Sequence, residues 1–168
     1  MAINEGTGRG GSAGHELAAR LIREEENFGA RVAARHAIDP SPPSQLRVIL
    51  EECAADYHVE SWIELWSLAR RDREARDVRQ RVDDEFRLMI ERVVRAGQES
   101  GNFAPLPAAD VALTLASIVD GFAIQATLHD QNVTSGYMLS AFVDAAELLL
   151  DCELPPSSGA SGHGNGNA

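Results

Sequence analysis

Apolar side chains recur along most of the chain at the three- and four-residue spacing of an α-helix. The pattern predicts helices over residues 15–38, 44–58, 61–71, 72–100, 108–128 and 135–152. No segment shows the alternation of apolar and polar residues that is typical of a half-buried strand. The sequence therefore predicts an all-α bundle of about six helices.

The most apolar of these helices, residues 108–128, has the sequence AADVALTLASIVDGFAIQATL. It is apolar on nearly every face, so it must be buried on more than one side. In a chain this short, we expect another subunit to cover one of those sides. Gly121, in the middle of this helix, costs about 1 kcal/mol relative to alanine, and we expect it to relieve crowding where another helix passes.

Both ends of the chain have a different composition from its centre. Residues 1–13 are rich in glycine and residues 155–168 in Ser, Gly and Asn, so both are expected to be disordered. Residues 14–154 are long enough to form one domain with a sizeable core. Within that domain, Asp72 is expected to cap the long fourth helix and Gly101 to end it.

The balance of charge argues against nucleic-acid binding by this chain alone. The net charge is −11, from 26 acidic residues and 15 basic residues, and every basic residue is an arginine. The arginines of residues 70–95 are interleaved with acids, whereas a DNA-binding surface needs clustered positive charge. No apolar run approaches the roughly 20 residues that a membrane span requires, and the amino terminus lacks the apolar centre of a signal peptide. We therefore expect a cytoplasmic protein without a membrane span.

The residue types of an active site or metal centre do not come together in the sequence. None of the five histidines has Asp or Glu three residues before it, which argues against a helical di-iron site. The HExxH, P-loop, GxGxxG and GxSxG motifs are also missing. Cys53 and Cys152 lie on separate helices, without metal-type spacing. We therefore expect neither an enzyme nor a metal or cofactor site.

Large apolar side chains on several helices form a candidate ligand pocket. If they converge, they could enclose an apolar or aromatic small molecule. Tryptophans and a Met/Phe seam at helical spacing are more often plain core, so we expect a few of them to border a pocket and most to be core. The candidate residues are Trp62, Trp66, Phe86, Met89, Val93, Phe103 and Phe122.

Several short motifs resemble the carboxy-terminal domain of TetR-family repressors, and the BetI-like branch in particular. They are WIELW at residues 62–66, ARRD at 69–72, SGNF at 100–103, DVA at 110–112 and IVDGF at 118–122. The resemblance covers roughly residues 14–154. It implies a bundle whose last two helices form a four-helix bundle with those of a partner subunit, and a pocket for an inducer. The interface residues we expect are Ala112, Ala116, Val119, Ala123, Phe142, Val143, Ala146 and Leu150.

The chain departs from this family pattern at its start, where the helix-turn-helix of a repressor is missing. We expect either a truncated regulator or a start placed too far downstream. The resemblance thus implies the ligand-sensing and dimerisation domain of a transcriptional repressor. The alternative is a stand-alone helical dimer that binds a small molecule or a partner regulator.

Overall fold

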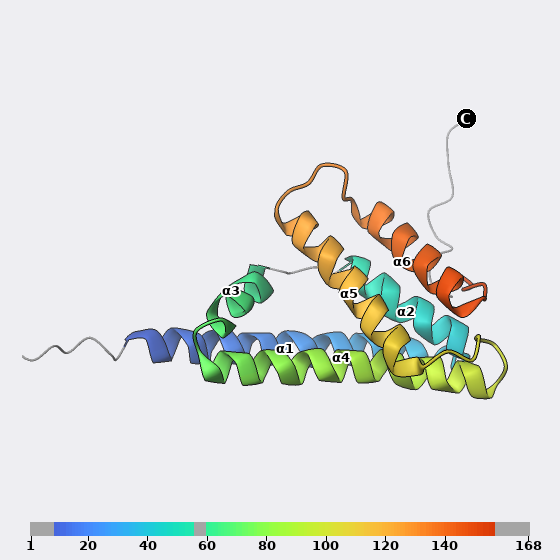
Figure 1. The fold of residues 1–168 in the computed structure, drawn as a ribbon, viewed down its shortest axis with the longest axis horizontal. Helices are drawn as coiled ribbons and strands as arrows, with labels where there is room; N and C mark the ends of the chain where they lie inside the picture. The colour runs from blue at the N-terminus through green and yellow to red at the C-terminus, as the bar shows by residue number, and fades with distance from the viewer. Residues whose placement is uncertain (1–8, 56–59, 157–168) are drawn as a thin grey trace, which may run out of the picture.

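The described part of the chain consists of α-helices joined by short loops. The structure, a computed structural model, describes residues 9–55 and 60–156. Its helices are α1 (Arg9–His36), α2 (Pro42–Ala55), α3 (Glu60–Ala69), α4 (Arg73–Glu99), α5 (Ala108–Thr127) and α6 (Ser135–Leu150) (Figure 1). Within those residues there is no β-strand, so the predicted all-α fold is confirmed.

The two longest helices form one layer, on which the others pack. In Figure 1, α1 and α4 lie side by side and run in the same direction. The short α3 packs across both of them, α5 crosses α4, and α6 returns antiparallel to α5. Helix α2 packs against α1, α4 and α6. Helices α3 and α5 therefore lie apart from each other on the same side of the α1–α4 pair.

Capping residues set several of the helix ends where the sequence predicts them. The Asp72 side chain accepts a hydrogen bond of 2.8 Å from the Ala75 N–H at the start of α4. After α4, Gly101 has a φ of 75°, a left-handed conformation that glycine adopts without a Cβ penalty. Thr134 caps α6 by accepting from the Tyr137 N–H at 3.2 Å. These caps satisfy backbone groups that the helix itself leaves without partners.

The beginning of the first helix differs from the prediction. Helix α1 begins at Arg9, so residues 9–13 are helical and not part of a disordered segment. The prediction relied on the low helix propensity of glycine. Propensity is a weak guide to where a helix begins when packing against another helix stabilises it. Here Gly14 of α1 lies against α3, close to the Leu68 side chain. Residues 1–8 and 157–168 lie outside the described part of the chain.

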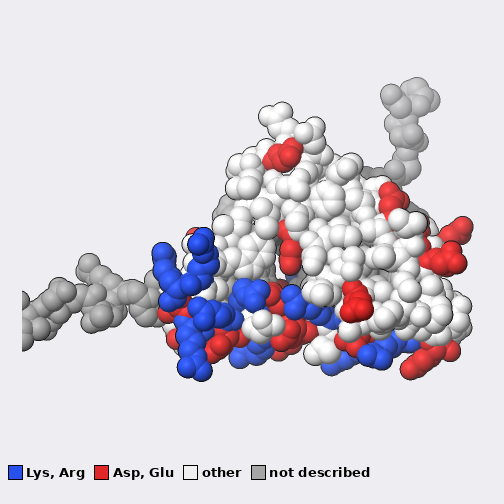
Figure 2. Space-filling model, viewed as in Figure 1, with Lys and Arg blue, Asp and Glu red and all other residues white. Residues whose placement is uncertain are grey.

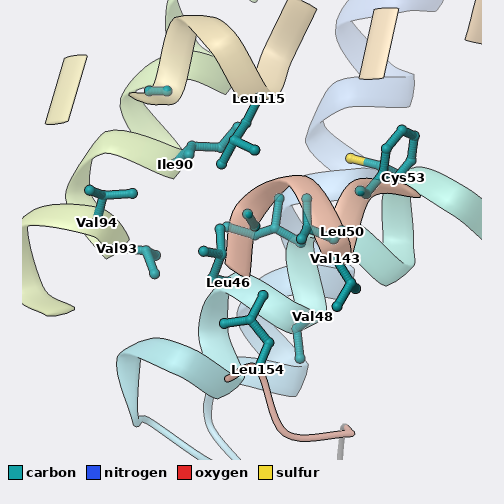
Figure 3. Close-up of a cluster of buried hydrophobic side chains, with 14 of the residues drawn as sticks. Leu46, Val48, Leu50, Cys53, Ile90, Val93, Val94, Leu115, Val143 and Leu154 are labelled. Carbon is teal, nitrogen blue, oxygen red and sulfur yellow. The ribbon is translucent and has the colours of Figure 1, made fainter. Parts of the chain in front are cut away.

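The apolar core is divided into two clusters. The larger joins α2, α4, α5 and α6, and Figure 3 shows Ile90 of α4 and Leu115 of α5 pointing toward each other within it. The smaller cluster lies under α3, where Leu21 and Leu65 are fully buried. Phe86 packs against the larger cluster and Trp62 against the smaller one. Phe86 and Trp62 are therefore partly buried residues at the edges of the two clusters.

Ion pairs hold α1 to α2. Arg31 donates to Glu52 at 2.8 Å, and Arg35 donates to Glu52 at 2.9 Å and also to Glu51. Glu51 in turn accepts from Arg47 of its own helix at 2.8 Å. The two carboxylates are largely shielded from solvent, so these pairs are screened less than ordinary surface pairs. The network fixes the second half of α1, which also forms one wall of the candidate site.

Candidate functional site

A cavity of about 260 Å³ lies where the two core clusters meet. Its walls come from α1, α3, α4 and α5, and Cys53 of α2 also lines it. In Figure 2 the surface is hollowed at the corresponding place, between α3, α5 and the α1–α4 pair. The volume is near the lower end of the range for small-molecule pockets. The cavity is therefore large enough for a compact organic ligand.

Aromatic rings form much of the cavity wall. Trp62 and Trp66 are one helical turn apart on α3, with ring centroids 6.2 Å apart. Phe28 of α1 and Phe86 of α4 meet edge to face at 6.1 Å. Ring faces carry negative electrostatic potential and attract cations. The wall thus offers both apolar contact and a surface suited to positive charge.

Carboxyl groups line the same cavity from three helices. They are Glu24 and Glu25 on α1, Asp83 on α4 and Asp120 on α5. Asp83 accepts a hydrogen bond of 2.6 Å from Arg79 and lies 3.8 Å from Arg87. Among the described residues, neither Glu25 nor Asp120 has a hydrogen bond or ion pair of this kind. Two of the cavity carboxyl groups are therefore not hydrogen-bonded to a guanidinium group, although Arg87 and Arg79 lie near enough to Asp120 to favour its ionised form.

The pKa values of these carboxyl groups respond to their surroundings. Burial, reinforced by repulsion from Glu85, Asp83 and Glu24, raises the pKa of Glu25 to about 7. Asp120 remains accessible to solvent within the cavity. Loss of solvation there, with repulsion from Asp83 and partly offset by attraction to Arg87 and Arg79, raises its pKa to about 6. Both shifts mean that the empty cavity resists negative charge. A bound cation would relieve that cost.

Three of the predicted ligand-binding residues line this cavity: Trp62, Trp66 and Phe86. The other four do not line it. Val93 and Phe103 are buried core residues and Met89 packs against the same core. Phe122 instead makes ring contacts of 5.8 Å with Tyr137 and Phe142 of α6. Helical spacing identified apolar faces correctly but could not say which of them meet around an open space.

Most of the residues expected at the dimer interface lie inside the single chain. Six of the eight are buried within the chain itself: Ala112, Ala116, Phe142, Val143, Ala146 and Leu150. The other two, Val119 and Ala123, are partly buried and line the cavity. Because α5 and α6 are apolar on several faces, periodicity could not separate the face that packs inside the chain from the face left outside.

Sequence analysis missed the carboxyl groups of the cavity. Glu25 belongs to a run of three glutamates, which is usually a solvated face, and Asp83 lies among other charges on α4. One signal was present in Asp120, an acid near the centre of an otherwise apolar helix. A charge in such a position needs a partner or a function. In the structure, Asp120 lines the cavity.

The arrangement is suited to binding, and among the described residues that line the cavity no nucleophile has an adjacent base. Cys53 is the thiol at the cavity, and burial raises its pKa, so it stays protonated and unreactive. Among the described residues there is no group of three or more His, Cys, Asp or Glu side chains placed to hold a metal ion. Aromatic faces and carboxylates together are the usual means of holding an organic cation.

Comparisons with known proteins agree with the fold and the motifs. Residues 43–151 match the family model of the BetI-type transcriptional repressor, C-terminal domain. No curated protein is significantly similar to the sequence.

Solved structures with the same fold include two regulators. One is a TetR transcription regulator from Haloarcula marismortui, with a TM-score of 0.70 and 23% identity over 80% of this chain and 73% of that chain. Another is a transcriptional regulator from Saccharomonospora viridis solved in complex with choline, with a TM-score of 0.72 and 20% identity over 80% of this chain and 72% of that chain. At these identities the likeness concerns the fold, whereas the family model covers most of the chain. The chain therefore belongs to the BetI-type repressors of the TetR family, and residues 43–151 form their C-terminal domain.

Proposed function

We propose that this domain is the dimeric, ligand-sensing part of a cytoplasmic transcriptional repressor, and that its ligand is an organic cation. The observation that carries the proposal is the cavity in which Glu25 and Asp120 lie beside four aromatic rings. The domain would shift between two conformations, and the ligand would favour the one that binds DNA less well. The DNA-reading element itself is not among the described helices, which are committed to the bundle.

The charge of the cavity changes the ligand class expected from the sequence. An apolar or aromatic neutral molecule would fill the space between the rings but would leave both carboxyl groups without a cation in direct contact. A buried charge without a partner is costly, whereas a cation over aromatic faces gains about 0.5–2 kcal/mol for each good contact. The cavity therefore favours a cation with an apolar body. The choline bound to the Saccharomonospora viridis regulator is a ligand of this class in a relative of the same fold.

The tryptophans provide a direct test of ligand binding. Trp62 and Trp66 are the only tryptophans of the chain, and both line the cavity. We expect choline and tetramethylammonium to change the tryptophan fluorescence in a saturable way at about pH 8, where both cavity carboxyl groups are ionised. Glu25→Gln should weaken this binding about tenfold, since it removes a carboxylate facing the cation.

Glu26→Gln is the matched control, because Glu26 is the next residue on α1 but is exposed and does not line the cavity. It should bind both cations like the wild type. If fluorescence and melting temperature stay unchanged with every cation tested, the cavity is plain core and the proposed ligand class is wrong.

The proposed dimer rests on the surface of α5 and α6. Helix α5 is long and apolar enough to cross a membrane, although no membrane span was expected from the sequence. Only 28% of the most apolar window of α5 is buried within the chain. Buried core helices meet the same criteria. Leu113 of α5 is 48% exposed, and Tyr137 and Leu148 of α6 are 55% and 85% exposed. Figure 2 shows few charged side chains on the visible surface of these two helices. A second copy packed on this surface would bury it, as expected from the sequence.

Leu148→Arg should convert the dimer to a monomer at micromolar concentration. The side chain makes little contact within its own chain, so folding should be unaffected, while the charge would be buried without a partner in the interface. Light scattering measures the mass. Ile38→Arg is the control, because Ile38 is 69% exposed in the loop between α1 and α2 and should leave the dimer intact. A wild-type monomer at that concentration would refute the proposed assembly.

A further inference from the structure

We propose that Arg87 of α4 competes with the ligand from within the protein: its guanidinium group balances the cavity acids while the cavity is empty, and a bound organic cation displaces it. The inference rests on the proposed function and names the residue that limits how tightly a cation binds. Arg87 lines the cavity together with Asp83 and Asp120. Part of the positive charge that a ligand would bring is therefore already present on a side chain of the protein.

Arg87 is held less firmly than the other arginine beside the same acid. Arg79, Asp83 and Arg87 follow one another at intervals of four residues, which places them along one face of α4. Arg79 donates to Oδ2 of Asp83 at 2.6 Å, whereas Nη2 of Arg87 lies 3.8 Å from the same oxygen. A separation of 3.8 Å is too long for a hydrogen bond. Asp83 therefore holds Arg87 by attraction at longer range.

The Nε–H group of Arg87 adds to this loose fit. It is buried, and among the described residues it has no hydrogen-bond acceptor. A buried donor without an acceptor destabilises the arrangement that contains it. If the side chain moved toward water, this donor would gain the hydrogen bond that it lacks beside the cavity.

Attraction to the cavity acids keeps Arg87 in place. Loss of solvation and repulsion from Asp83 raise the pKa of Asp120, and attraction to Arg87, followed by attraction to Arg79, opposes that rise. Arg87 thus favours the ionised form of Asp120 while the cavity is empty. A second cation beside Asp83 and Asp120 would repel Arg87 and take over this function.

An acid outside the cavity can receive the displaced side chain. Nη1 of Arg87 lies 3.6 Å from Asp84, which is exposed and does not line the cavity. Arg87 itself is already partly exposed. Rotation toward Asp84 and water would free the cavity acids for the ligand, while Asp83 would keep its hydrogen bond to Arg79.

This competition makes the cavity selective for organic cations. Exchange of the Arg87 guanidinium for another charge brings little by itself, because one cation takes the place of another. Contact of an apolar body with the rings of Trp62, Trp66, Phe28 and Phe86 supplies the difference. A hydrated inorganic cation has no such body and should leave Arg87 where it is.

The first arm of the test observes Arg87 directly in the full chain. The arginine Nε–H resonances are recorded by ¹⁵N NMR at about pH 8, without and with saturating choline, and the Arg87 signal is identified by its loss in Arg87→Gln. We expect choline to shift this signal and to speed its exchange with water, because the group leaves its buried position. The signal of Arg92, which is exposed on the same helix and does not line the cavity, should stay unchanged.

The second arm measures affinity by calorimetric titration. Arg87→Gln should bind choline about tenfold more tightly than the wild type, because no internal cation has to be displaced. Arg92→Gln is the matched control, since it changes the net charge equally, and it should bind choline like the wild type. The uncharged analogue of choline, with a tert-butyl group in place of trimethylammonium, should show no gain in Arg87→Gln.

The outcomes separate this inference from the proposed function. If choline binds while the Arg87 signal keeps its position and exchange rate, the inference is overturned and the cation site remains. Unchanged choline affinity in Arg87→Gln, or an equal gain for the uncharged analogue, would also overturn it, because Arg87 would then affect only the space available. If the wild type binds neither choline nor tetramethylammonium, the proposed ligand class fails as well.

Discussion

Replacing Gly97 by alanine is expected to destabilise the protein by about 1–3 kcal/mol, the usual cost of overpacking a core. Gly97 lies on the buried face of α4, directly beneath the Phe103 ring. A Cβ atom at this position would clash with Cδ2 and Cε2 of the Phe103 ring. The clash outweighs the gain of about 1 kcal/mol in helix propensity that alanine brings.

The Phe103 ring has little freedom to move away. The N–H groups of Asn102 and Phe103 both donate to the Gly97 carbonyl, at 2.8 and 3.2 Å, so the loop is tied to the residue that would be changed. Urea unfolding measures the loss. Gly29→Ala is the matched control, because no atom outside its own helix lies within 4 Å of the added Cβ, and it should leave stability unchanged or raised. Equal stability of the Gly97→Ala variant and the wild type would contradict the packing described.

Replacing Glu25 by glutamine is expected to stabilise the ligand-free protein above about pH 7, by about 1–3 kcal/mol. The folded state holds the pKa of Glu25 near 7, above its ordinary value of 4.5. Between these two values the folded chain binds more protons than the unfolded chain, so stability falls as the pH rises through this window. Glutamine has no charge to desolvate and removes that loss.

Denaturant unfolding at about pH 4.5 and about pH 8 checks this prediction. The difference in stability between Glu25→Gln and the wild type should be small at the lower pH and clearly in favour of the variant at the higher pH. Other carboxyl groups titrate in both proteins and cancel in the difference. Glu26→Gln should show no such change, since Glu26 is exposed. A difference that is the same at both pH values would mean that Glu25 is not buried in a repulsive site.

The elements that carry strong local signals were predicted well from the sequence. Asp72 and Gly101 enclose α4, and both act as the sequence suggests. The start of α5 at Ala108, after a loop with two prolines, was also predicted. In each case the end of the helix is determined by the backbone geometry of a few neighbouring residues, so the local sequence is enough to predict it.

The site was predicted only in part, because it depends on which helical faces meet. Trp62, Trp66 and Phe86, three of the residues expected at a ligand pocket, line the cavity. Phe103 and Phe122 have the same chemistry but pack against Gly97 and α6. Such differences arise from tertiary packing between residues far apart in the sequence, and helical periodicity contains no information about them.

The charge of the site was hidden for a related reason. Glu25 resembles an ordinary surface glutamate until α4 and α5 bring Asp83 and Asp120 into the same cavity. Packing of the helices desolvates the Glu25 carboxyl group, and repulsion from nearby acids, Asp83 among them, adds to the effect. The ligand class that we propose, an organic cation with an apolar body, is therefore narrower than the apolar or aromatic molecule expected from the sequence.

The central claim is that the cavity recognises positive charge on an apolar body. The most direct test is a pair of calorimetric titrations at about pH 8 with choline and with its uncharged carbon analogue, in which a tert-butyl group replaces the trimethylammonium group. The two ligands have nearly the same shape and differ in charge. We expect choline to bind at least about tenfold more tightly, a difference of about 1.4 kcal/mol. Equal or tighter binding of the uncharged analogue would contradict the account.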